Sequence, residues 1–217
     1  MIKLRTCEVL ADSVETQKLR AKFDQRHCLR LTGLLDDSLL ELLRPRLDRG
    51  QWTHRQHHDI GKELVLQDNY ALNLLHFAVN APAFLGAIAS LTGCEDIKRF
   101  RGRIYRMEPN SDHYDTWHDD LSEDRLVGMS VNLSFDGYEG GEFELREREA
   151  LGRAAKIAPR FAGDAVLFRI DPGIEHRVAP LAGNHPRTAF AGWFRSGKPD
   201  PVNELAQSAA ARRESSA

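Results

Sequence analysis

Six short runs of β-favouring residues follow one another in the second half of the chain, and they limit the available folds more than any other feature. Turn-forming residues separate these runs, among them Asp136-Gly137, Gly140-Gly141 and Asp171-Pro172-Gly173. The predicted strands cover residues 97–107, 127–135, 142–147, 164–170, 175–180 and 187–194. Short strands at such spacing are typical of an antiparallel sandwich or barrel.

Helical patterns dominate the first hundred residues instead. A segment capped by Asp12-Ser13 and running to about Arg26 predicts one helix, and Asp36-Asp37-Ser38 starts another, which Pro45 is expected to kink or end. Residues 70–79 and 82–92 predict two more helices, and residues 27–31 are a candidate strand.

We therefore expect one mainly β (α+β) domain over residues 1–196. Residues 1–96 are rich in helices that cover one sheet face, and residues 97–196 form the strand-rich core. Residues 197–217 consist largely of Ala, Ser and charged residues and predict a flexible tail.

Composition excludes several classes of protein. The chain has 217 residues and a formal net charge of −2, which disfavours a dedicated nucleic-acid binder. The cysteines (Cys7, Cys28 and Cys94) lie far apart, so a disulfide framework and a thiolate zinc site are excluded. No apolar run suits an export signal or a membrane span, and we expect a soluble, cytoplasmic protein without a membrane partner.

The segment Trp117-His118-Asp119-Asp120 carries the clearest chemical signal. In an extended segment residues two apart point the same way, so His118 and Asp120 can face one centre while Asp119 points away. His176 begins a late predicted strand and can supply a third ligand. Two imidazoles and one carboxylate leave metal positions open, which is the ligand set of non-haem Fe(II) oxygenases.

A basic residue, Arg187, follows His176 in the sequence. Arg187 lies 11 residues beyond His176, across an apparent hairpin, so pairing of the two strands would bring Arg187 near His176. There its guanidinium could bind a carboxylate through two hydrogen bonds. Each signal alone is weak, because a lone His-x-Asp pair arises often by chance.

Together with two further segments, this set resembles the Fe(II)/2-oxoglutarate-dependent dioxygenases, and most of all their prolyl-4-hydroxylase-like branch. The family pattern is His-x-Asp, a distal His and a basic residue about ten positions later, here His118, Asp120, His176 and Arg187. The further segments that resemble the family are Tyr138-Glu139-Gly140-Gly141-Glu142-Phe143 and Gly163-Asp164-Ala165-Val166-Leu167-Phe168. The resemblance covers roughly residues 100–196 and implies a double-stranded β-helix (jelly roll).

The resemblance also implies a chemistry. Fe(II) would be held by His118, Asp120 and His176, and 2-oxoglutarate would be bound as cosubstrate by Arg187. With O2, such an enzyme hydroxylates an unactivated C–H bond of an amino acid, peptide or small metabolite and releases succinate and CO2. Ascorbate is left open as a further cofactor, and no catalytic residue separate from the metal ligands is expected.

The chain departs from the family pattern at two points. A tyrosine upstream of His-x-Asp often helps to hold the cosubstrate; Tyr105 is the better match and Tyr114 the alternative. Some relatives place a tyrosine beside the tail carboxylate, where this chain has Val131-Asn132-Leu133. Either Asn132 substitutes for it or Arg187 acts alone.

Other readings remain open. The basic face of Arg99, Arg101 and Arg103 is interpreted as solvated, although it allows a dioxygenase directed at nucleic acid. The histidines at 54, 57 and 58 are interpreted as an exposed loop. A non-catalytic jelly-roll binding protein with a vestigial or zinc-filled site, and a metal-dependent hydrolase, are the further alternatives.

Overall fold

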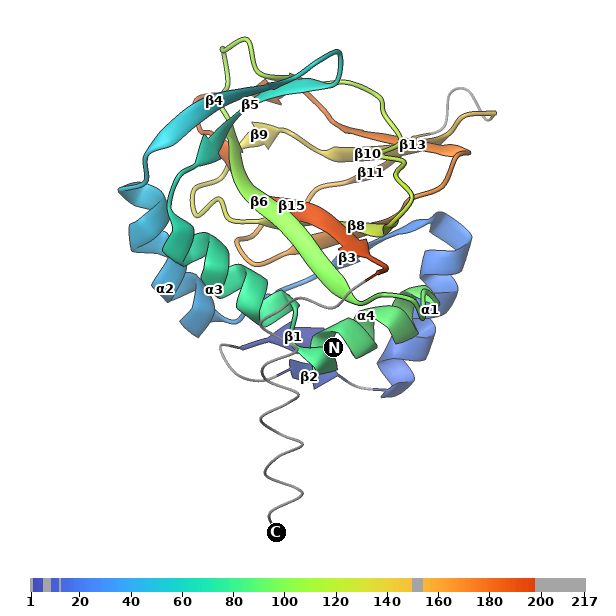
Figure 1. The fold of residues 1–217 in the computed structure, drawn as a ribbon. Coiled ribbons are helices and arrows are strands. Elements are labelled where there is room, and N and C mark those ends of the chain that lie inside the picture. The colour runs from blue at the N-terminus through green and yellow to red at the C-terminus, as the bar shows by residue number, and fades with distance from the viewer. Residues whose placement is uncertain (1, 6–8, 12, 150–153, 198–217) are drawn as a thin grey trace.

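The computed structural model describes residues 2–5, 9–11, 13–149 and 154–197, so Cys7 and the predicted tail from residue 198 lie outside the described residues. Its largest feature is an antiparallel eight-stranded sheet with the order β3-β12-β8-β15-β6-β5-β4, in which β7 pairs with β5 (Figure 1). The strands of this large sheet are β3 (Cys28–Leu31), β4 (Trp52–His57), β5 (Gly61–Leu66), β6 (Arg99–Met107), β7 (Tyr114–Asp115), β8 (Arg125–Asn132), β12 (Ala165–Arg169) and β15 (Arg187–Arg195).

A second, small sheet has the order β11-β10-β13. It consists of β10 (Phe143–Glu147), β11 (Ala154–Ile157) and β13 (Ile174–Val178). Two short pairs complete the described strands: β1 (Ile2–Leu4) with β2 (Val9–Ala11), and β9 (Glu139–Gly140) with β14 (Leu181–Ala182). Mainly β structure in curled antiparallel sheets is the expected jelly-roll architecture.

Four helices cover the face of the large sheet that is turned away from the small sheet (Figure 1). They are α1 (Ser13–Arg26), α2 (Asp37–Asp48), α3 (Asn69–Val79) and α4 (Pro82–Thr92). Asp36 and Asp68 cap α2 and α3 by accepting backbone N–H bonds. Pro45 does not end α2, which continues to Asp48, and it lies on an exposed side of the helix.

Apolar residues divide into two main cores. The larger one packs the helices against strands of the large sheet and includes Phe84, Phe100, Phe190 and Phe194. The smaller one lies between the two sheets and includes Phe143 and Phe168. Because the space between the sheets is only partly filled by apolar residues, a cavity remains at one end of the barrel.

The predicted helices and six predicted strands are confirmed within a few residues. The segment 54–58 differs from the prediction: His54 and His57 belong to β4, which forms a hairpin with β5, where an exposed loop was expected. Strands β3, β4 and β5 also join the large sheet from the helix-rich half of the chain. No single helix in the described residues could span a membrane; only the bent pair α3 and α4 has the length and composition together.

Candidate metal centre and cosubstrate pocket

Three predicted side chains converge at the cavity. The Nε2 atoms of His118 and His176 lie 3.7 Å and 3.2 Å from Oδ2 of Asp120. One ligand atom from each residue lies within 4.8 Å of the other two, which identifies a group that can hold a metal ion. Two imidazole nitrogens and a carboxylate oxygen are a suitable donor set for Fe(II).

The backbone brings the three together in a way that differs from the expected extended strand. His118 and His176 form an isolated antiparallel bridge, with N–H to O distances of 3.1 Å and 2.8 Å. Asp120 has a φ of 57°, a left-handed conformation that aspartate tolerates better than most residues. Asp119 points elsewhere, as predicted, and accepts a hydrogen bond from Arg148.

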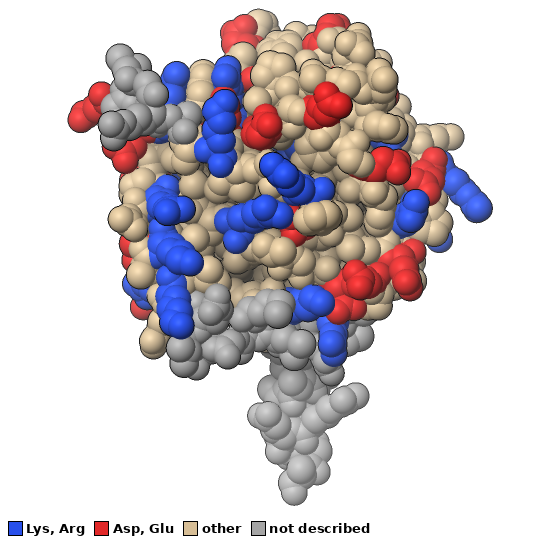
Figure 2. All heavy atoms as spheres, turned by 180° about the vertical axis from the view of Figure 1, so that it is seen from behind, with Lys and Arg blue, Asp and Glu red and all other residues tan. Residues whose placement is uncertain are grey.

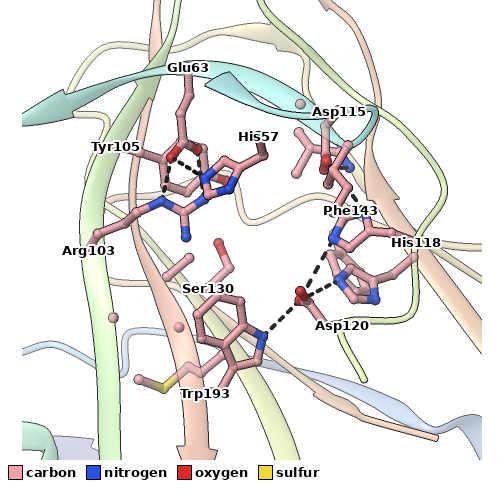
Figure 3. Close-up of a pocket in the computed structure, with 18 of the residues that line it drawn as sticks. His57, Glu63, Arg103, Tyr105, Asp115, His118, Asp120, Ser130, Phe143 and Trp193 are labelled. Atoms are coloured by element: carbon pink, nitrogen blue, oxygen red, sulfur yellow. Dashed lines mark hydrogen bonds and ion pairs between the residues drawn. The ribbon is translucent and has the colours of Figure 1, made fainter. Parts of the chain in front are cut away.

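Neighbouring groups fix the orientation of these ligands. Nδ1 of His118 lies 2.7 Å from the Thr116 carbonyl, which leaves Nε2 for the metal. Trp193 donates its Nε1–H to Asp120 Oδ2 at 2.8 Å (Figure 3). Arg125 donates to Asp120 Oδ1 at 3.1 Å. The imidazole of His176 packs against the rings of Phe143 and Phe168. These contacts restrain the three candidate ligands.

The charges in the group are strongly coupled. Burial opposes protonation of His118, but its hydrogen bond to Asp120 and the charges of Asp115 and Asp120 raise the pKa of His118 to about 9. Burial also opposes ionisation of Asp120, but both imidazoles hold the pKa of this carboxyl well below its usual range. Burial raises the pKa of Asp115. The Asp120 carboxylate thus attracts positive charge to the position where a metal would bind.

Arg187 is fully buried and lies close to the expected tyrosine. Its guanidinium donates to the Tyr105 hydroxyl at 2.5 Å and to Ser130 Oγ at 3.2 Å, while Nε has no hydrogen-bond partner in the described residues. Gly141, in the predicted glycine turn, has a φ of 64°, and a Cβ there would lie 2.9 Å from Arg187 Cδ. This glycine therefore gives the arginine its space.

The predicted hairpin between His176 and Arg187 is wrong. Strand β13 pairs with β10 in the small sheet, whereas β15 pairs with β6 and β8 in the large sheet. The two residues therefore lie on opposite layers. Arg187 is fully buried, and the two side chains to which it donates, Tyr105 and Ser130, line the cavity.

Of the two candidate tyrosines, Tyr105 is the one that contacts Arg187. Tyr114 lines the cavity but is partly exposed. Asn132 does not take the position expected for it: its amide donates to the Pro159 carbonyl and its oxygen accepts from the Ser134 N–H. Ser130, two residues earlier on the same face of β8, contacts Arg187 instead.

The cavity has a volume of about 510 Å³ and includes residues that the sequence prediction missed. Arg103 forms a two-pronged ion pair with Glu63, and this pair lies across the cavity from Asp120 and His118, with His57 beside it (Figure 3). The predicted solvated face of β6 is correct for Arg101, which is exposed, but not for Arg103, which is half-buried against Glu63; both residues line the cavity. The basic alternation in residues 99–103 was the available signal.

Comparisons with known proteins agree with this geometry. Residues 102–195 match the family model of the 2OG-Fe(II) oxygenase superfamily. No curated protein is similar enough in sequence to count as a relative.

Solved structures share the fold at low sequence identity. A prolyl-4-hydroxylase from Pseudomonas putida has 18% identity and a TM-score of 0.63, over 84% of this chain and 99% of that one. A Trichoplax adhaerens prolyl hydroxylase, solved with a hypoxia inducible factor peptide fragment, has 17% identity and a TM-score of 0.61, over 88% and 95%. The non-heme alpha ketoglutarate dependent epimerase SnoN from nogalamycin biosynthesis has 13% identity and a TM-score of 0.62, over 85% and 84%. Residues 102–195 of the chain are thus similar to the 2OG-Fe(II) oxygenase superfamily, and the described residues share their fold with solved prolyl hydroxylases of that kind.

Proposed function

We propose that the protein hydroxylates an unactivated C–H bond of an amino acid, peptide or small metabolite in an Fe(II)- and 2-oxoglutarate-dependent reaction. The observation that carries this proposal is the convergence of one ligand atom each from His118, Asp120 and His176 within 4.8 Å. When bound, the metal and cosubstrate supply oxidising power: one oxygen atom of O2 enters the substrate and the other enters succinate, with loss of CO2.

The residues of this chain would bind the metal and orient the cosubstrate. Both histidines offer Nε2 and Asp120 offers Oδ2, so three ligand positions come from protein and the others stay open for cosubstrate and O2. Arg187 is the expected partner of the far carboxylate of 2-oxoglutarate, because its guanidinium keeps a buried Nε–H without a partner among the described residues. Phe143 and Phe168 exclude water from one side of the centre.

The alternatives are less well supported. A vestigial binding protein has no need for a complete ligand set beside a buried arginine, and a zinc hydrolase has no use for Arg187. The net charge of −2 disfavours a nucleic-acid substrate. The Trichoplax enzyme was solved with a peptide fragment and SnoN belongs to nogalamycin biosynthesis, so this fold accommodates both peptide and small-molecule chemistry in other proteins.

Metal binding is the first test. Anaerobically purified protein should bind one Fe(II) per chain, and His176→Ala should lose it because two ligands hold the ion far less tightly than three. Asp119→Asn is the matched control, since Asp119 neighbours the group but bonds Arg148. An iron content unchanged in His176→Ala would remove the assignment.

Turnover is the second test. Protein supplied with labelled O2, 2-oxoglutarate and chloride should release one succinate for each oxygen atom placed in a product identified from a screen of amino acids, peptides and cell extract. We expect no chlorinated product, because Asp120 occupies the ligand position that a halide would need. Chlorination, or substrate turnover without 2-oxoglutarate consumption, would contradict the proposal.

A further inference from the structure

Positively charged side chains line the cavity from several separate strands. The cations that line it are Arg55, Lys62, Arg101, Arg103, Arg125 and Arg195, whereas the acidic residues are Glu63, Asp115 and Asp120. On one face of the molecule, several Lys and Arg side chains lie close together near the middle (Figure 2). A cleft lined mostly by one sign of charge concentrates ligands of the opposite sign.

Most of the negative charge is concentrated at the metal ligands. Asp115 and Asp120 belong to the group around His118, and Asp120 also forms an ion pair with Arg125. Arg195 pairs with Asp124, and Lys62 pairs with Asp112. Glu63 is therefore the one acidic residue that lines the opposite side of the cavity among the described residues.

Glu63 neutralises only some of the charge around it. Both of its oxygens are engaged by Arg103, although Arg55 lies directly opposite on β4. No hydrogen bond or ion pair within the described segments of the chain holds Arg55. His57 Nε2 is buried, lies 3.6 Å from Glu63 and has no hydrogen-bond partner there.

The pKa of His57 reflects the excess of positive charge around it. Burial lowers it, and repulsion by Arg103 and Arg55 lowers it further, against the attraction of Glu63. Arg101 adds a further cation, because it lies two residues from Arg103 on the same face of β6. This side of the cavity therefore carries three arginines, Arg55, Arg101 and Arg103, against one glutamate.

We propose that the substrate carries an anionic group, a carboxylate or a phosphate, which binds against Arg55 and Arg101 on the side of the cavity away from the metal ligands. This inference rests on the proposed function, since it assigns the substrate of the same site. Guanidinium groups bind both anions through paired hydrogen bonds. Because these cations line one cavity in a chain of net charge −2, they favour a small anionic molecule over a nucleic-acid strand.

Titration calorimetry with three probes tests this assignment: inorganic phosphate, N-acetylglycine and its neutral amide. The protein is loaded with Mn(II) and saturating 2-oxoglutarate, and ionic strength is held constant because salt screens such contacts. We expect saturable binding of at least one anion and none of the amide. The two anions distinguish a phosphate-bearing from a carboxylate-bearing substrate.

The variants Arg55→Gln and Arg101→Gln should each raise the dissociation constant of the bound anion several-fold, and together at least tenfold. Both side chains are exposed, so the substitutions should leave the melting temperature unchanged. Arg106→Gln is the matched control: Arg106 lies on the opposite face of β6, over Trp52 and bonded to Thr188.

Three outcomes would overturn the proposal: no binding of either anion, equal binding to the double variant, or displacement of 2-oxoglutarate by the anion. The last result would assign these cations to the cosubstrate. The anion titrations are repeated on metal-free protein, so a failure of metal binding sinks the proposed function without deciding the anion site.

Discussion

A single carboxylate organises the candidate metal centre. Asp120 Oδ2 faces both imidazoles and accepts the Trp193 N–H, while Oδ1 accepts from Arg125. Arg125 in turn stacks on Trp193, with its guanidinium carbon 3.6 Å from the ring centroid. Because Trp193 and Arg125 restrain each other, Asp120 has one orientation although its backbone is in the left-handed region.

Trp193→Phe tests this restraint. The substitution keeps most of the ring but removes the N–H donor, so Asp120 should rotate more freely. Loss of such a supporting hydrogen bond typically lowers metal affinity by about 10–100-fold. Anaerobic Fe(II) titration should show this loss, whereas Trp117→Phe should not, because Trp117 stacks against Arg146 and Arg177 instead.

Arg187 offers a second prediction at the scale of one residue. Its removal leaves a 2-oxoglutarate carboxylate without its partner, a loss of roughly 2–5 kcal/mol. Arg187→Ala should therefore raise the 2-oxoglutarate KM at least tenfold, and Arg187→Lys, which keeps the charge but not the fork, should raise it less. Arg177→Ala should not change it, because Arg177 pairs with Glu144. Equal effects of Arg177→Ala and Arg187→Ala would remove Arg187 from the cosubstrate site.

At the scale of strands and helices, the sequence predicts elements whose two faces differ in polarity. Helices α3 and α4 and strands β6, β8 and β15 bury one apolar face, so their patterns were readable. Strand β4 carries polar residues on both faces, because one side meets solvent and the other meets the charged cavity. No apolar alternation marks such a strand, and its segment therefore resembled a loop.

The residues of the site were likewise predictable only in part from the sequence. The candidate metal ligands and Arg187 could be named from the sequence because a family pattern fixes their spacing. Trp193 and Ser130 were missed, since their contacts depend on pairing between β15 and β8, which are far apart in sequence. The hairpin error has a related cause: in a two-layered fold, strands that follow each other can belong to opposite sheets.

The contact between β6 and β15 leads to a prediction about stability. Gly102 and Gly192 face each other there, and a Cβ on Gly192 would lie 2.0 Å from the Arg101 carbonyl oxygen. Gly192→Ala should push the two strands apart and lower the free energy of unfolding by roughly 1–3 kcal/mol.

Gly86→Ala is the control, and it is expected to change stability in the opposite direction. Gly86 lies exposed in α4 with nothing near its Cβ position, so alanine should stabilise the helix by about 0.5–1 kcal/mol. Urea denaturation of both variants measures the difference, and equal stability would show that the strands can adjust.

At the scale of the whole molecule, the candidate metal centre lies between the two layers of the fold. His176 belongs to β13 in the small sheet, while Asp120 is held by Trp193 and Arg125 of the large sheet. Without a metal, the direct contacts here are the His118–His176 bridge and the ion pairs to Asp120. An ion bound by these three residues would therefore tie the small sheet to the large one.

Metal binding should accordingly stabilise the entire fold. The unfolded chain does not bring these three ligands together, so an ion at 100 times its dissociation constant adds about 2.7 kcal/mol to the free energy of unfolding. For a chain of this size that corresponds to an increase of roughly 5–11 °C in melting temperature. Differential scanning calorimetry with Mn(II), chosen because it does not oxidise readily, should show this increase in one cooperative transition. His176→Ala should not respond to Mn(II), whereas Asp119→Asn should respond fully. An equal increase in His176→Ala would place the ion elsewhere, and a separate transition for the small sheet would show that the ion does not link the layers.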